Sequence, residues 1–180
     1  KFYRKAMAAG VKPVIGVDLR IFNDDEPNRP FTLVLLVQNT DGCRNLSELV
    51  TRSYVQGQVR GAPMARKEWL TAESCAGLIA LSGGLHGDIG HALHANHAAQ
   101  ARELLDGWTT VFPGRFYLEL IRTGRAGEED CVRASLELAS ATNTPVVATN
   151  DVRFLSRDDF NAHEARVCIH DSRVLADSER

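Results

Sequence analysis

Short apolar runs alternate along the chain with longer stretches in which apolar residues recur every three or four positions. The short runs predict strands at residues 11–22, 31–38, 77–82, 115–120 and 145–148. The longer stretches predict helices at residues 2–9, 43–55, 67–72, 88–95, 98–110, 128–142 and 157–170. Because strands and helices alternate repeatedly, the pattern predicts an α/β fold, either a barrel or a wound sheet.

The stretch PVVATNDVRF, residues 145–154, is predicted to organise this fold. Its first four residues are apolar and uncharged, which favours a strand buried on both faces of a parallel sheet. Thr-Asn-Asp then turns the chain and places Asp151 at the carboxyl end of that strand, where α/β proteins bind ligands and metals. Any junction between a strand and a loop can carry an Asp, so a metal site and an ordinary turn both remain open.

Composition narrows the class of protein. The 180 residues are 44% hydrophobic, which predicts a single domain over residues 1–180 without an internal linker. A net charge of −2 argues against a direct electrostatic grip on nucleic acid. The chain begins with Lys1, in residues that read as the middle of a helix, and this favours a fragment of a longer polypeptide.

Cysteine spacing and hydropathy point to a cytoplasmic protein. The four cysteines are far apart and form no C-x-x-C pair, which argues against a zinc knuckle or a disulfide framework and for a reducing compartment; they are Cys43, Cys75, Cys131 and Cys168. No apolar run reaches the roughly 18 residues of a membrane span, so we expect no membrane association.

Clustered histidines are the first candidate for metal chemistry. They are His86, His91, His94 and His97. Successive steps of three residues drift around a helix, and Asp88 is the only nearby carboxylate, so surface or capping roles are favoured over a metal site. His163 shares a helix face with Phe160 and Val167, which favours a packed core histidine over a ligand.

Two other groups of residues have a functional and a structural interpretation. The turn from Arg122 to Arg125 precedes a helix and could hold a phosphate, but Glu128, Glu129 and Asp130 already bring negative charge to that helix end, so self-capping is favoured. Three aromatic residues, Tyr3, Phe116 and Phe154, lack the spacing of a base-stacking platform and are predicted to be core residues.

Six collinear phrases carry a resemblance that covers essentially the whole chain. They are GVKPVIGVDLRI, NTDGCRNL, GLIALSGG, FPGRFYLELIRTGR, PVVATNDVRF and DFNAHEARVCIHD. In this order and spacing they resemble the PHP (polymerase and histidinol phosphatase) domain of bacterial replicative DNA polymerase III alpha subunits. The resemblance implies a distorted (β/α)₇ barrel of the PHP type with a metal site at the carboxyl ends of its strands. This chain would be incomplete at the N-terminal end, lacking the opening units that carry the first histidine ligands.

The resemblance also implies where ligands would lie, position by position. Active PHP domains have a carboxylate at Asp18, a His at Thr32, a Cys or His at Gly84 and an Asp-x-His pair at Asp151 and Arg153. Asp18 and Asp151 therefore remain as ligand-type residues, whereas the other three positions are substituted. Threonine is a poor ligand, glycine supplies none, and a guanidinium repels Zn²⁺ or Mn²⁺. An arginine at 153 can instead neutralise Asp151.

These substitutions favour a degenerate site without a catalytic residue and without a cofactor in this segment. The implied function is a non-catalytic scaffold that stabilises the polymerase during DNA replication and docks a separate proofreading exonuclease. Its partners would be the rest of the alpha chain and that exonuclease subunit, with DNA contacted only through the polymerase. The alternative is a working metal-dependent 3′–5′ exonuclease or phosphoesterase, with Zn or Mn as its cofactor. A free-standing small-molecule phosphatase would need the ligands even more and fits the polymerase-type phrases poorly.

Overall fold

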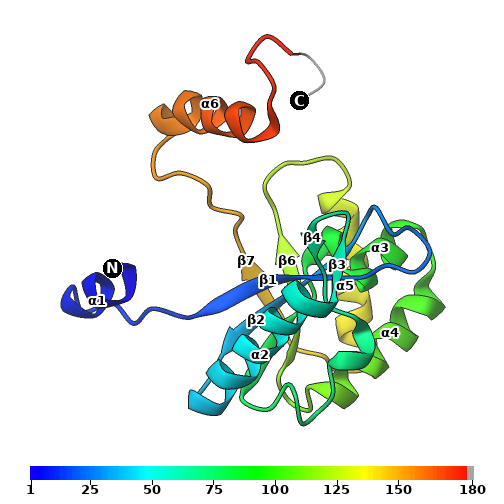
Figure 1. The fold of residues 1–180 in the computed structure, drawn as a ribbon. Helices are drawn as coiled ribbons and strands as arrows, with labels where there is room; N and C mark the ends of the chain where they lie inside the picture. The colour runs from blue at the N-terminus through cyan, green and yellow to red at the C-terminus, as the bar shows by residue number, and fades with distance from the viewer. Residues whose placement is uncertain (178–180) are drawn as a thin grey trace. The chain divides into compact units, whose positions relative to one another are not determined.

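The computed structural model describes residues 1–177, and its chain divides into two compact units. The first unit comprises residues 1–149 and contains the sheet and most of the helices (Figure 1). The second begins at Asn150 and contains one α-helix. Each unit is described by itself.

A five-stranded mixed sheet forms the centre of the first unit. Its strands are β1 (Gly16–Ile21), β2 (Phe31–Val37), β5 (Leu78–Leu81), β6 (Phe116–Ile121) and β7 (Val146–Thr149), in the order β1-β2-β5-β6-β7. Strand β2 is antiparallel to β1 and β5, whereas β5, β6 and β7 are parallel. The amino end of β2 therefore lies at the same edge of the sheet as the carboxyl ends of the other four strands. The predicted α/β class is confirmed.

One face of this sheet is covered by four helices. They are α2 (Thr40–Gln56), α3 (Asp88–His94), α4 (Ala98–Val111) and α5 (Glu128–Thr142). Leucines of β1 and β2 pack with apolar residues from all four helices in one hydrophobic core. Trp108 of α4 is 2% exposed and stacks on Phe116 of β6, with ring centroids 6.4 Å apart, so the sheet and its helices share an aromatic centre.

The start of α2 illustrates how local sequence fixes this packing. The Asn39 side chain caps the helix by accepting a hydrogen bond from the Gly42 backbone N–H at 2.9 Å. Gly42 lies so close to Gly77 that an added Cβ would be 1.9 Å from the Gly77 carbonyl oxygen. Only glycine at 42 lets the helix approach the loop that leads into β5.

The remaining elements of the first unit are short. They are α1 (Phe2–Ala8), β3 (Gln58–Val59), β4 (Ala62–Pro63), and the 3₁₀ turns η1 (Lys67–Trp69) and η2 (Gly84–His86). Helix α1 buries none of its residues. The β3–β4 hairpin lies in the glycine-rich segment after α2, for which the sequence predicted no element.

Several sequence predictions about strands and helices require correction. The 145–148 strand, expected to be buried on both faces, is the edge strand β7, and its Val146 is 42% exposed. Apolar β-branched residues favour any strand, central or edge, so this composition did not distinguish the two. The strand predicted over 11–22 is confined to β1, because only its second half pairs along β2. The helix predicted over 67–72 is the single 3₁₀ turn η1.

The second unit contains the 3₁₀ turn η3 (Arg157–Asp159) and helix α6 (Phe160–Asp171). Ser156 and Asp159 form a capping box at the start of η3. Within α6 only Cys168 is buried. The His163 side chain is half-buried and lies against the Phe154 ring, with ring centroids 5.4 Å apart. It is therefore not the core residue that the sequence predicted.

The three aromatic residues predicted as core have different outcomes. Phe116 is buried in the sheet core, as expected. Tyr3 and Phe154 are 52% and 36% exposed, so the core prediction is wrong for both. Tyr3 lies on α1, which buries none of its residues, and Phe154 lies in the second unit.

Candidate functional site

The sheet face opposite the helices carries the polar side chains of interest. Strand pairing places Asp18 opposite Val34, Val34 opposite Leu81, and Leu81 opposite Tyr117, and paired residues point to the same face. Side chains two residues apart also share a face. This face, which we term the carboxylate face, is defined by residues Asp18, Arg20, Thr32, Val34, Leu81, Tyr117, Glu119, Ile121, Val147 and Thr149.

Glu119 of β6 is the residue of this face that sequence reasoning missed. It is 6% exposed, and its Oε1 accepts a hydrogen bond from the Thr149 hydroxyl at 2.6 Å. Burial is the main cause that raises the pKa of the Glu119 carboxyl; the Thr149 hydroxyl and the Gly83 backbone oppose this, and Asp18 adds to it. The signal in the sequence was a single acidic residue inside the otherwise apolar strand FYLELI.

Asp18 and Thr32 lie on neighbouring strands of the carboxylate face. Thr32 pairs with Arg20, which places it diagonally across from Asp18. Asp18 is exposed and Thr32 half-buried. These two predicted positions are therefore brought close together, as the resemblance implies.

Gly84, the third predicted position, immediately follows the turn after β5. Its φ is +53°, a left-handed conformation that side chains rarely adopt. A Cβ added there would lie 2.9 Å from Cδ1 of Ile121. The space into which a ligand side chain would project from position 84 is already occupied by an isoleucine.

Asp151 and Arg153 lie in the second unit, two residues apart. Arg153 Nε is 2.7 Å from Asp151 Oδ1, which confirms the predicted ion pair between them. The two side chains are 57% and 22% exposed, so solvent screens much of their attraction.

The donor set does not fit a metal cluster. Across residues 1–177 there is no group of three or more His, Cys, Asp or Glu side chains that could hold a metal ion. A zinc or manganese site needs several such ligands converging on one ion. We therefore derive no chemical step that passes through a metal.

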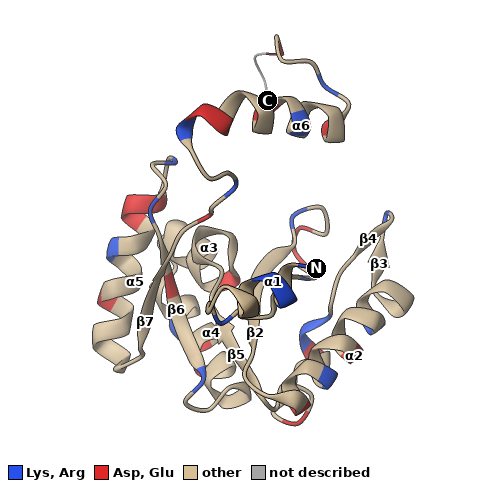
Figure 2. Ribbon diagram, turned by 90° about the vertical axis from the view of Figure 1, so that its left-hand side faces the viewer, with Lys and Arg blue, Asp and Glu red and all other residues tan. Residues whose placement is uncertain are grey.

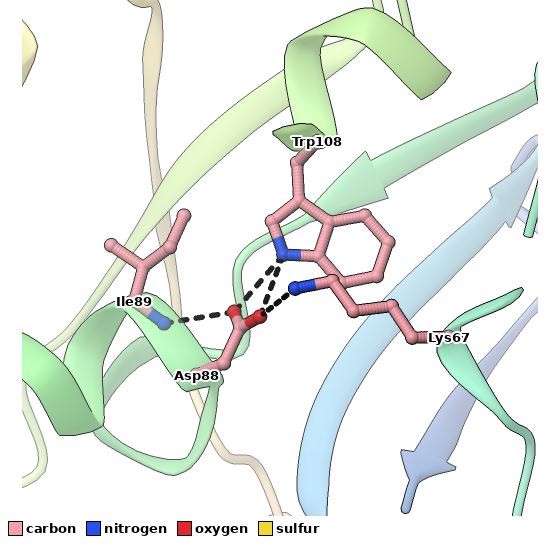
Figure 3. A network of polar contacts seen from close by, with 4 residues as sticks. All are labelled: Lys67, Asp88, Ile89 and Trp108. Atoms are coloured by element: carbon pink, nitrogen blue, oxygen red, sulfur yellow. Dashed lines mark hydrogen bonds and ion pairs between the residues drawn. The ribbon is translucent and has the colours of Figure 1, made fainter. Parts of the chain in front are cut away.

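Asp88, the carboxylate near the clustered histidines, is engaged in a structural network (Figure 3). Its two oxygens accept hydrogen bonds from Trp108 Nε1 at 3.0 and 2.9 Å, and Oδ1 also accepts from the Ile89 backbone N–H. Lys67 Nζ lies 3.1 Å from Oδ2 and 4.7 Å from the centre of the Trp108 ring. This carboxylate joins η1, α3 and α4, which supports the structural interpretation of the cluster.

The turn that leads into α5 is closed by its own carboxylate. Glu128 accepts hydrogen bonds from the backbone N–H groups of Thr123, Gly124 and Arg125 and from the Thr123 hydroxyl, at 2.6–3.2 Å. These donors lower the pKa of Glu128, with the Thr123 hydroxyl as the largest contribution. The predicted self-capping is confirmed, and the acidic first turn of α5 is visible in Figure 2.

The fold and this face define a mixed α/β domain with acidic residues on the sheet face opposite its helices. A sequence model described as "PHP domain" matches residues 1–123. The chain belongs to the PHP domain family, as its sequence phrases indicate.

Comparison with individual proteins extends the similarity over the whole chain. The chain is 46% identical to the DNA polymerase III subunit alpha of Pseudomonas aeruginosa, 43% to that of Escherichia coli and 42% to that of Vibrio cholerae. Each alignment covers 100% of this chain and 15% of the relative. The chain thus spans about 15% of the length of these relatives. Among residues 1–177, no helix has the length and apolar character needed to cross a membrane.

Proposed function

We propose that this chain is a non-catalytic PHP domain of a bacterial replicative DNA polymerase III alpha subunit, and that it serves as a scaffold during DNA replication. Similarity to three such subunits over all 180 residues supports the assignment to the polymerase. In this proposal residues 1–180 form one partial domain of a longer cytoplasmic polypeptide. The domain closes into the distorted barrel of its family only together with further chain.

The single observation that carries the scaffold role is the ion pair of Arg153 with Asp151, at 2.7 Å. Active members have an Asp-x-His pair at these positions, so a metal would there meet an imidazole and a carboxylate. Here a permanent cation neutralises the carboxylate from within the chain. The aspartate can stay ionised without an external ion.

Two further positions support the loss of the ligand set. Gly84 offers no ligand, and Ile121 occupies the space beside it. Thr32 adds only a hydroxyl, a poor ligand for a transition metal. Asp18 and Asp151 are then remnants whose counter-charges come from the protein or from solvent.

The partners of this scaffold follow from the same assignment. They are the rest of the alpha chain and a separate proofreading exonuclease subunit, with DNA contacted only through the polymerase. The alternative function is a metal-dependent 3′–5′ exonuclease, which needs ligands that this chain lacks at three of its five corresponding positions.

The test uses the full-length polypeptide that carries this chain, purified without chelator. We expect less than stoichiometric zinc and manganese by elemental analysis, and no 3′–5′ exonuclease activity that a chelator abolishes. A restored site needs Thr32→His, Gly84→Cys and Arg153→His together with Ile121→Ala, because Ile121 would otherwise collide with the new cysteine. The matched control is Ile121→Ala alone, which should bind no metal. Stoichiometric metal with chelator-sensitive nuclease activity in the unmodified protein would overturn the proposal.

A further inference from the structure

No further inference is drawn: the strongest candidate, the buried Glu119 carboxyl group on the carboxylate face, belongs to the site already described, and apart from its raised pKa no contact among the described residues shows what its Oε2 atom would bind.

Discussion

Glu119 and Glu128 are both 6% exposed and lie nine residues apart, yet the chain treats them in opposite ways. Glu128 accepts three backbone N–H bonds and one hydroxyl bond at the start of α5, and its pKa is lowered. Glu119 accepts one hydroxyl bond on the carboxylate face, and its pKa is raised. Burial is the main cause that raises the pKa of Glu119, whereas at Glu128 the hydrogen-bond donors outweigh the effect of burial and lower the pKa.

This difference also shows which acids could serve an external ligand. The Glu128 carboxylate is saturated by its own turn, and Asp88 is saturated by Trp108, Lys67 and a backbone amide. On the carboxylate face, Asp18 is exposed, and the buried Glu119 Oε2 has no hydrogen-bond partner among the described residues. The carboxylate face has acidic side chains, but within residues 1–177 no group of three or more His, Cys, Asp or Glu side chains could hold a metal ion.

The largest expected effect comes from Asp88, which extends the comparison to an acid saturated mainly by side chains. Asp88→Ala should lower the free energy of unfolding by about 3 kcal/mol, because the buried Trp108 N–H loses its charged acceptor. The measurement is urea unfolding at pH 7. Asp88→Asn keeps an acceptor oxygen and should lose about half as much. Equal losses in both variants would contradict the hydrogen-bond explanation.

Removing the acceptor of the α5 turn should have the next largest effect. Glu128→Ala should cost about 2 kcal/mol, since four donors lose their carboxylate but can be partly hydrated in an exposed turn. Glu129→Ala is the matched control and should cost about 0.5 kcal/mol or less, because its ion pair with Arg122 is exposed. A loss in Glu129→Ala as large as that in Glu128→Ala would show that charge at the helix end matters more than the closed turn.

The lowered pKa of Glu128 predicts a pH dependence opposite to that of Glu119. The folded chain keeps this carboxylate ionised below the ordinary glutamate pKa of about 4.3, so its stabilising effect is present above that value and is lost as pH falls through the folded pKa. Glu128→Gln should flatten the acid side of the stability profile. Thermal unfolding between pH 2.5 and 6 checks this, and an unchanged acid slope in the variant would refute it.

Arg153→Ala is expected to have the smallest effect. Its partner Asp151 is only partly buried, and exposed ion pairs contribute about 0–1 kcal/mol. The unfolding free energy should fall by no more than that, and added salt should reduce the difference further. A loss of several kcal/mol would show that Arg153 has a larger structural role than pairing with Asp151.

The sequence predicted the alternation of strands and helices well, because apolar spacing reflects which face of each element is buried. Helix α5 has the predicted boundaries, since it begins at an acidic turn and ends at Asn143 in a left-handed conformation. The sequence could not show that β7 lies at the edge of this sheet, because the pairing partners of a strand are set by tertiary structure and not by local composition. The importance of Glu119 was missed for a related reason: whether an acid in a strand is hydrated or buried depends on neighbouring strands far away in sequence.

The family phrases located Asp18 and Thr32 together and predicted the Asp151–Arg153 pair. They could not predict that Ile121 fills the space beside Gly84, because that contact joins segments 37 residues apart. Substituted positions in a site are visible in sequence, whereas the packing that replaces the lost ligand is visible only in three dimensions.

Metal binding by the unmodified full-length protein is the most direct test of the scaffold proposal. Titration with Zn²⁺ and with Mn²⁺, followed by calorimetry and by the midpoint of thermal unfolding, should show no saturable tight site and no stabilisation, since a ligand that binds only the folded state would raise that midpoint. A stoichiometric site that raises the midpoint of unfolding, and that disappears in Asp18→Asn, would contradict the account.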